Sequence, residues 1–310
     1  YLAGKPDNEA FNRALNAAIF SRAALGNGDG AANFVLAADS WIGALTSICH
    51  PRAPLTIARR HYICRKLAFD WRANLPDGFA VQIIDEDLLS RPLPDHIPEW
   101  IHRNWGSNAA FLDKGFGAVT LHDDRLVSWS LADCVSGSGC EIGIRTDPAY
   151  RRRGLAAITT AAAIECALSR GLSEVGWHCH EENVGSFKTA EKVGFELERC
   201  YTLYYMFVDE AEHLAESAWI AFQSARYAES VDLFGRVFAL RDDMPHYCYH
   251  TTARAWAALG DTDKALAYLD ETVKRDWSYR DFTESCAEFE PLRTLPQWTT
   301  ILDRMSSKEA

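Results

Sequence analysis

No stretch of this sequence is both long enough and apolar enough to cross a membrane. The longest apolar run, Leu155 to Leu168, has 14 residues and contains Glu165, whereas a spanning helix needs about 20 apolar residues. The succession of basic, apolar and small residues that marks a secretory signal is also missing from the first residues. We therefore expect a cytoplasmic protein that does not enter a membrane.

The cysteines lack the pattern of a disulfide framework. There are nine of them, an odd number, and no two are spaced as C-x-x-C. Scattered thiols of this kind are typical of a reducing compartment, where cysteines stay reduced and mostly buried. The cysteine pattern therefore also favours the cytoplasm.

Basic residues are too few for a protein that binds nucleic acid along its phosphate backbone. Lys and Arg total 32 against 43 Asp and Glu, so the net charge is -11. This surplus of negative charge opposes extended contact with phosphate backbones and with anionic lipid. We expect neither nucleic acid nor membrane among the partners, and a cationic partner suits the chain better. Against this background the cluster Arg151-Arg152-Arg153 stands out.

The chain has 310 residues, about twice the size of a typical domain, and an ordinary globular composition with 48% hydrophobic residues. It is therefore expected to fold into two or three units. Changes in hydrophobic periodicity place a small mixed α/β region at 1–77, an α+β domain at 78–210 and an all-helical domain at 211–310.

The periodicity also predicts the individual elements. In the first region it predicts helices over 8–25 and 40–48 and a strand at 34–36, without a chemical signature. In the second region it predicts one sheet with flanking helices. The strands are expected at 79–84, 116–121, 126–135, 140–146, 175–180, 195–201 and 203–208, and the helices at 97–105, 154–170 and 184–193.

The last hundred residues contain a helical repeat. The segment 227–234 aligns with 262–269 at an offset of 35 residues, close to the period of about 34 of helix-turn-helix repeats. The second copy carries small and large apolar positions that let paired helices nest, and it resembles the tetratricopeptide family. The first copy departs from that family at 224–226. Residues 292–305 are expected to form a capping helix.

The most informative stretch runs from Cys140 to Ala156. It places a strand, a tight loop with the pattern R-x-x-G-x-A and a helix start in succession, so backbone N–H groups can converge where the helix dipole is positive. Gly154 removes the side chain where a phosphate must approach the backbone, and neighbouring arginines add positive charge. The loop is therefore a candidate anion cradle.

About thirty residues later lies a second motif, N-V-G-S-F-K-T-A-E-K-V-G-F, from Asn183 to Phe195. Together with the loop, it resembles the GCN5-related N-acetyltransferases (GNAT) over roughly residues 78–208. Finer features such as E-I-G-I-x-T and W-x-C resemble the subgroup that includes the zwittermicin A resistance acetyltransferase. The resemblance implies a GNAT fold, a mixed central sheet flanked by helices, followed here by the tetratricopeptide-like array.

The resemblance also implies acetyl-CoA as cosubstrate. In the family the loop holds the pyrophosphate, two strands separate to admit the pantetheine arm, and the asparagine helps to orient it. The residues of this chain that the resemblance assigns to cofactor binding are Ile144, Thr146, Arg151, Arg152, Arg153, Gly154, Leu155, Ala156, Asn183 and Ser186.

Catalytic residues are less clearly marked. Many family members carry a tyrosine seven residues after the asparagine that protonates the CoA thiolate, but Ala190 occupies that position here. Tyr201, Tyr204 and Ser186 are the substitutes considered, and Tyr201 is preferred. For the base that deprotonates the amine, Glu141 is the first choice.

His178 and His180, which share one face of a strand, are the second choice for the base, with His180 preferred. A metal site at His178-Cys179-His180 is not expected, because Cys179 points to the other face.

These observations predict an acetyl-CoA-dependent N-acetyltransferase that acts on an amine of a small molecule, such as an amino-containing antibiotic. Two alternatives stay open at this point. One is a degenerate GNAT fold that serves as a scaffold for the helical repeats, and the other is an enzyme that uses another acyl-CoA or a hydroxyl acceptor. The helical repeats are also expected to bind a protein partner or a second copy of the chain.

Overall fold

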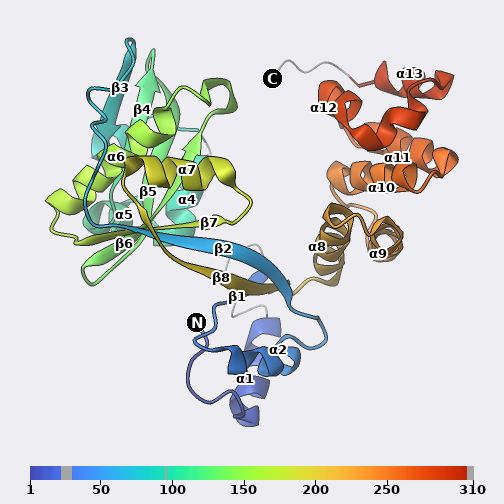
Figure 1. Ribbon diagram of the computed structural model, residues 1–310, viewed down its shortest axis with the longest axis horizontal. Helices are drawn as coiled ribbons and strands as arrows, with labels where there is room; N and C mark the ends of the chain where they lie inside the picture. The colour runs from blue at the N-terminus through green and yellow to red at the C-terminus, as the bar shows by residue number, and fades with distance from the viewer. Residues whose placement is uncertain (22–29, 95, 306–310) are drawn as a thin grey trace. The chain divides into compact units, whose positions relative to one another are not determined.

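The computed structural model of the chain describes residues 1–21, 30–94 and 96–305 (Figure 1). The chain forms two compact units. The sheet unit comprises Thr56–Tyr204, and the helical unit joins Tyr1–Leu55 to Tyr205–Ala310. The boundary expected at residue 77 differs from this division, because the strand β2, Leu55–Cys64, takes part in the sheet.

Strands of one sheet organise the sheet unit. Their order across the sheet is β8-β2-β7-β6-β5-β4-β3. Their bounds are β2 Leu55–Cys64, β3 Phe79–Ile83, β4 Gly117–His122, β5 Arg125–Ser136, β6 Gly139–Thr146, β7 Glu174–His180 and β8 Glu196–Phe207. The strands β4, β5 and β6 follow one another in the sequence and pair antiparallel.

The pairing of β6 with β7 creates an opening in the sheet. These two strands are parallel, and their pairing extends only from Gly139↔Glu174 to Glu141↔Gly176. On its other edge β7 stays paired with β2 as far as Arg59↔His180. Because β7 is held by β2 while β6 leaves it, the two strands separate beyond Glu141.

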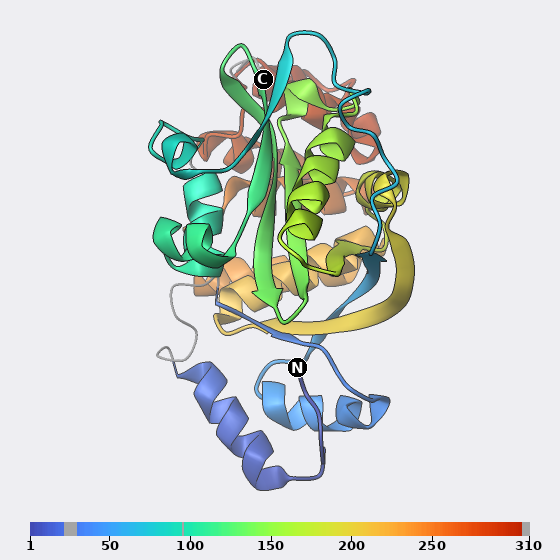
Figure 2. The same ribbon diagram turned by 90° about the vertical axis from the view of Figure 1, so that its left-hand side faces the viewer.

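Helices cover both faces of the sheet. On β4 and β5, Ala118 and Ala132 pack toward α6, Leu155–Ser169, and α7, Val184–Val193. Their neighbours Val119 and Leu131 pack on the opposite face. That face is covered by α3 Glu86–Leu89, α4 His96–Trp105 and α5 Asn108–Lys114. Figure 2 shows α6 lying along the strands. Side chains alternate between faces along a strand, so successive residues meet different helices.

The structure departs from the expected elements at particular places. The strand β2 was missed, because Arg59, Arg60 and His61 interrupt its apolar run. The short helices α3 and α5 were also missed. The two strands expected at 195–201 and 203–208 are one strand, β8, since no Gly or Pro interrupts it. The helix expected at 8–25 is α1, Glu9–Phe20, and its expected last turn lies outside the described residues.

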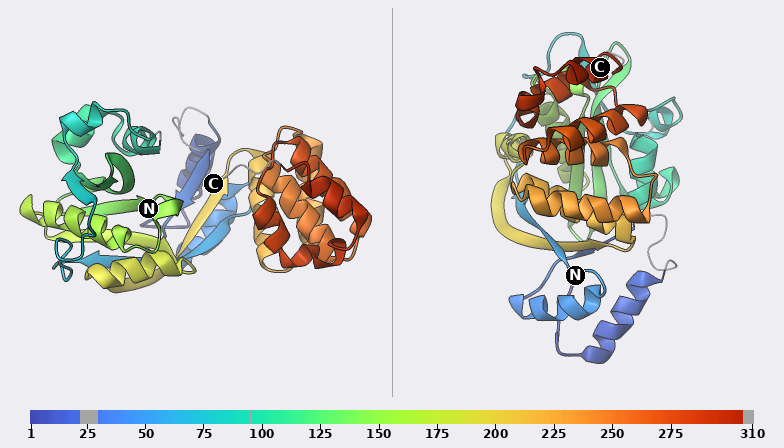
Figure 3. Two further views of the ribbon diagram at one scale, coloured as in Figure 1. Left: turned by 90° about the horizontal axis from the view of Figure 1, so that it is seen from above. Right: turned by 90° about the vertical axis from the view of Figure 1, so that its right-hand side faces the viewer.

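The helical unit contains a sequential array of helices (Figure 3). α8 packs on α9 and α10 packs on α11, and α11 begins at Thr262, 35 residues after α9 begins at Tyr227. The expected all-helical array is therefore confirmed. Its bounds are α8 Glu210–Gln223, α9 Tyr227–Leu240, α10 His246–Ala258, α11 Thr262–Lys274, α12 Arg280–Ser285, a 3-10 helix Ala287–Leu292 and α13 Pro296–Leu302.

The first 55 residues contribute small elements to this unit. They are α1, the strand β1 Ala31–Phe34, a 3-10 helix Asp39–Trp41 and α2 Ile42–Cys49. Trp41, Leu45 and Ile48 are buried. Throughout the described residues, no helix combines the length and the apolar character that crossing a membrane requires. All nine cysteines are free, and Cys134 and Cys200 are exposed.

A buried histidine makes the stability of the helical unit depend on pH. The ring of His250 is stacked on Trp277 and lies 3.2 Å from the hydroxyl of Thr283. Burial, with smaller effects from Arg254 and His246, lowers the pKa of His250 from 6.5 to about 3. Between these values the unfolded chain binds more protons than the folded chain, so the free energy of unfolding decreases as pH falls.

We expect this loss to reach at most about 1.4 kcal/mol per pH unit between pH 6 and pH 4. The His250→Gln variant should be less stable at neutral pH but should have a flatter profile. Denaturant unfolding of both proteins across this range measures the difference in slope. Parallel profiles would mean that His250 is not the group that titrates.

Candidate functional site

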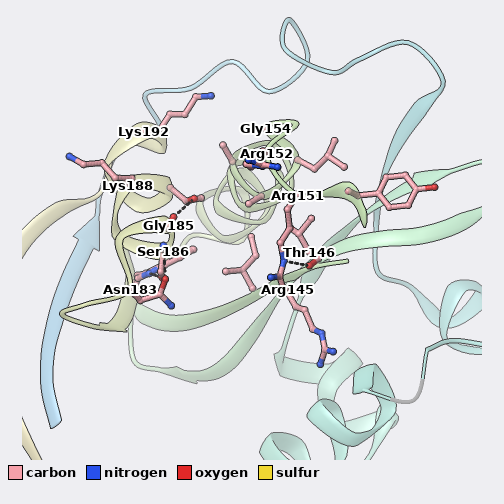
Figure 4. A pocket seen from close by; sticks show the side chains of 17 residues that line it. Arg145, Thr146, Arg151, Arg152, Gly154, Asn183, Gly185, Ser186, Lys188 and Lys192 are labelled. Atoms are coloured by element: carbon pink, nitrogen blue, oxygen red, sulfur yellow. Dashed lines mark hydrogen bonds between the residues drawn. The ribbon is translucent and has the colours of Figure 1, made fainter. Parts of the chain in front are cut away.

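A cleft of about 700 Å³ lies where β6 and β7 separate. Its walls are the end of β6, the start of α6 and the start of α7 (Figure 4). Of the residues that the sequence assigns to cofactor binding, all but Arg153 line this cleft. The guanidinium of Arg153 instead lies 5.2 Å from the centre of the Tyr150 ring.

The loop before α6 presents its backbone to the cleft. Gly154 has φ +81° and Arg152 has φ +61°, a left-handed conformation that glycine adopts most easily. No heavy atom lies within 4 Å of the place where a Cβ on Gly154 would stand, and α6 has no side-chain cap there. The first N–H groups of a helix have no acceptor within it. They therefore remain available to an anion.

The rim of the cleft is cationic although the chain is acidic. Arg145, Arg151, Arg152, Lys188 and Lys192 line it, and within the described part of the chain its lining includes no carboxylate. In Figure 4 the two lysines lie on α7 on one side of the cleft, and Arg151 and Arg152 lie on the other. The cleft therefore has two sources of positive charge, the N-terminal end of α6 and the basic side chains of the rim. Both would stabilise a bound polyphosphate.

Asn183 and Ser186 have structural contacts as well. The side-chain oxygen of Asn183 accepts the N–H of Ser186 at 3.1 Å and so caps α7. The hydroxyl of Ser186 accepts the indole N–H of Trp177 on β7 at 3.1 Å. These bonds fix the start of α7 against the strand that forms the other wall of the cleft.

The opposite face of the sheet carries a cluster of titratable side chains. Glu141 on β6 and His178 on β7 alternate with Ile142 and Trp177, which pack toward α6 and α7. The Nε2 atom of His178 lies 3.5 Å from Oε1 of Glu141. The Nε2 atom of His61 on β2 lies at the same distance from this oxygen. The cluster therefore joins three neighbouring strands where the opening between β6 and β7 begins.

The surroundings of Glu141 favour its ionised form. Burial by itself would raise the pKa of the Glu141 carboxyl, but the imidazoles of His178 and His61 outweigh burial and lower the pKa to about 2. The hydroxyl of Tyr201 on β8 lies 3.0 Å from Nδ1 of His178. Burial raises the pKa of the Tyr201 phenol. Glu141 is thus a carboxylate at neutral pH, and Tyr201 keeps its proton.

Glu141 and Tyr201, two of the catalytic candidates, both lie next to His178 and not next to His180. His178 touches both of them, whereas His180 is exposed one position further along the same face of β7. Sequence reasoning missed His61 altogether because β2 was not recognised. The basic residues Arg145, Lys188 and Lys192 were also missed, although their positions beside the two motifs could have indicated them.

A comparison with family models identifies a match to the GNAT acetyltransferase model over residues 1–204. The chain belongs to the GNAT acetyltransferase family. This match begins at the first residue, whereas the sequence motifs placed the start of the resemblance near residue 78. The additional residues include β2, which pairs with β7 and contributes His61 to the site.

A curated relative is the uncharacterized N-acetyltransferase YdfB of Bacillus subtilis (strain 168), which is 30% identical over 138 residues. The match covers 44% of this chain and 52% of YdfB, so the chain spans about half the length of this relative.

Similar solved structures include a GCN5-related N-acetyltransferase-like protein of Streptococcus suis 89/1591, with 28% identity, a TM-score of 0.45 and coverage of 54% of this chain and 68% of that one. A putative GNAT-family acetyltransferase of Novosphingobium aromaticivorans DSM 12444 has 20% identity and a TM-score of 0.36. The match covers 49% of this chain and 64% of that one.

Ala190 has no access to the cleft of this GNAT chain. It is fully buried and packs in the core with Trp177 and Val193, while its neighbour Thr189 lines the cleft. Because alanine also has no proton to donate, a general acid would have to come from another position. Tyr201, through its contact with His178, is the protonated group next to the cluster, and Ser186 lies in the cleft itself.

Gly176 makes room for the Glu141 carboxylate. A Cβ at Gly176 would overlap the carboxyl group of Glu141, which is the end of a flexible side chain and can move away. We expect Gly176→Ala to fold and to bind acetyl-CoA normally while displacing Glu141 from the imidazoles. Misplacement by about 1 Å can cost roughly 100-fold in turnover. Steady-state kinetics beside calorimetry of acetyl-CoA binding test this, and unchanged turnover would contradict it.

Proposed function

We propose that the chain is an acetyl-CoA-dependent N-acetyltransferase that transfers the acetyl group to an amine of a small molecule. One observation carries the proposal: a cationic cleft with free helix amides opens where two parallel strands separate. The amides near Gly154 would bind the pyrophosphate, and the basic rim would bind the remaining phosphate. The pantetheine arm would follow Ile144 and Trp177 and bring the thioester between the strands.

The chemistry of the proposed reaction uses the cluster beyond that opening. An ammonium must lose a proton before its nitrogen attacks the thioester carbonyl. We assign this proton to Glu141, directly or through water, with the adjacent imidazole of His178 as a further acceptor and His180 as the more distant candidate. Tyr201 would return a proton to the CoA thiolate as the carbon–sulfur bond breaks.

The proposed acceptor is an amine-bearing small molecule, and an amino-containing antibiotic is the first one to test, because the motifs resemble the zwittermicin A resistance subgroup. The proposal places the enzyme in the cytoplasm, where its free thiols are stable. The helical unit, with its tetratricopeptide-like period of 35 residues, is proposed to bind a protein partner or a second copy of the chain.

The test is acetyl transfer by the purified full chain from acetyl-CoA to a panel of amines, with products identified by their mass. The panel contains amino-containing antibiotics, polyamines and basic peptides, each beside an analogue in which a hydroxyl replaces the amine. Transfer to amines alone supports the proposal. Binding of acetyl-CoA without transfer to any member would favour the scaffold function, and transfer to the hydroxyl analogues would favour an O-acyltransferase.

A further inference from the structure

Side chains from three neighbouring strands converge on one point of the sheet unit. His61, Glu141 and His178 each offer one atom that can bind a metal ion, and these atoms all lie within 4.8 Å of one another. His61 and His178 are directly opposite each other in the pairing of β2 with β7. Their positions are therefore set by the hydrogen bonds of the sheet rather than by a mobile loop.

A polar side chain of β8 lies beside Nδ1 of each imidazole. Nδ1 of His61 lies 2.9 Å from a carboxylate oxygen of Glu198 on β8, and Nδ1 of His178 lies 3.0 Å from the hydroxyl of Tyr201. Nε2 of each ring lies 3.5 Å from the same carboxylate oxygen of Glu141. Metal-binding histidines are commonly oriented in this way, through a carboxylate or another polar group on the second ring nitrogen.

The surroundings of His61 would suit a bound cation. The ring is buried and lies between the carboxylates of Glu141 and Glu198. Oε2 of Glu141 and both ring nitrogens of His61 are buried and make no hydrogen bond in the described structure. A metal ion bound between these groups would give each of these atoms a partner.

We propose that His61, Glu141 and His178 form a binding site for Zn²⁺. Two imidazole nitrogens and one carboxylate oxygen are a donor set that binds zinc and leaves one position open. The 3.5 Å separations from Glu141 to each nitrogen are close to the edge of about 3.3 Å of a tetrahedron whose metal–ligand bonds are about 2.0 Å long.

One adjustment is needed for both rings to bind the same ion. The two imidazoles are stacked with centroids 4.1 Å apart and planes 7° from parallel, so their lone pairs run side by side. A rotation of one ring about χ2, which is a broad torsion for histidine, makes them converge. A bound ion would occupy the lone pairs of Glu141 and His178, which could then not accept a proton. The proposed catalysis therefore applies to the metal-free protein.

The test uses Co²⁺ as a spectroscopic probe on the full chain. The exposed thiols are first removed in a Cys134→Ser/Cys200→Ser background, and the protein is treated with a chelator. We expect one equivalent of Co²⁺ to produce visible d–d bands without a thiolate charge-transfer band, and one equivalent of Zn²⁺ to remove them. Absence of these bands at millimolar Co²⁺ would overturn the proposal.

Matched variants separate this site from adventitious binding. His61→Gln and Glu141→Gln should abolish the bands. Glu198→Gln, which removes the carboxylate beside Nδ1 of His61, should weaken binding about 10- to 100-fold, whereas Glu196→Gln on the same strand should not. Bands that persist in His61→Gln and Glu141→Gln would also overturn the proposal. Acetyl-CoA calorimetry on each variant reports folding and tests the cofactor cleft independently, so failure of the metal site and failure of the proposed function are distinguishable.

Discussion

Gly154→Glu is expected to weaken acetyl-CoA binding by at least about 100-fold. The new side chain would enter the open space beside Gly154 and bring a carboxylate to the amides that are proposed to bind the pyrophosphate. Two like charges about 4 Å apart repel by roughly 4 kcal/mol near a protein surface, and each 1.4 kcal/mol is a factor of ten in affinity. Calorimetric titration with acetyl-CoA measures the loss.

The matched control is Gly171→Glu. Gly171 lies just beyond the C-terminal end of α6, has φ +83° and also has no heavy atom within 4 Å of a Cβ. This variant imposes the same residue change and the same backbone strain, of about 1 kcal/mol, away from the cleft. It should bind acetyl-CoA normally. Equal affinity of Gly154→Glu and the original protein would show that the loop before α6 is not the phosphate site.

The cofactor cleft could be predicted from sequence because its parts are local. The strand β6, the loop with Gly154 and the start of α6 follow one another, and the glycine and arginines mark the loop directly. The second motif works in the same way, since Asn183 both begins the pattern and caps α7. Patterns of this kind depend on neighbours within one or two turns, which a single sequence records.

The cluster around Glu141 could not be predicted in full, because it depends on which strands pair and in what register. His61 comes from a strand 80 positions earlier in the chain than Glu141, and it reaches the site only because β2 pairs with β7. The strand β2 contains three consecutive polar residues, so its sequence lacks the alternation of apolar and polar residues that predicts a strand. A shift of one residue in the register would turn His61 to the other face, and local sequence does not specify that register.

The division of the chain into these two units cannot be seen in the sequence for the same reason, whereas the spacing of the repeated helices can. The chain leaves the helical unit at Leu55 and returns to it at Tyr205, and composition changes along the chain do not reveal such a return. The helices α9 and α11, by contrast, repeat at 35 residues with similar sequences. Repetition is visible without knowledge of long-range contacts.

Glu141→Gln is expected to lower turnover by roughly 100- to 10,000-fold, the range of general-base assistance, while acetyl-CoA affinity stays nearly unchanged. Glutamine keeps the shape and one hydrogen-bond acceptor of the side chain but removes the charge. It therefore loses both the acceptor for the amine proton and the negative charge that lies 3.5 Å from Nε2 of His178. The assay is performed on chelator-treated protein, so that no ion occupies Glu141.

Comparison with the neighbouring histidines identifies the group that takes the proton. If Glu141 is the acceptor, Glu141→Gln should have the largest effect, His178→Gln a smaller one through the lost partner, and His180→Gln little, since His180 is exposed further along β7. If turnover survives in Glu141→Gln and collapses in His178→Gln or His180→Gln, the role belongs to that histidine. Full activity of all three variants would mean that the amine loses its proton to water, and that the protein contributes chiefly by holding the thioester and the amine in place.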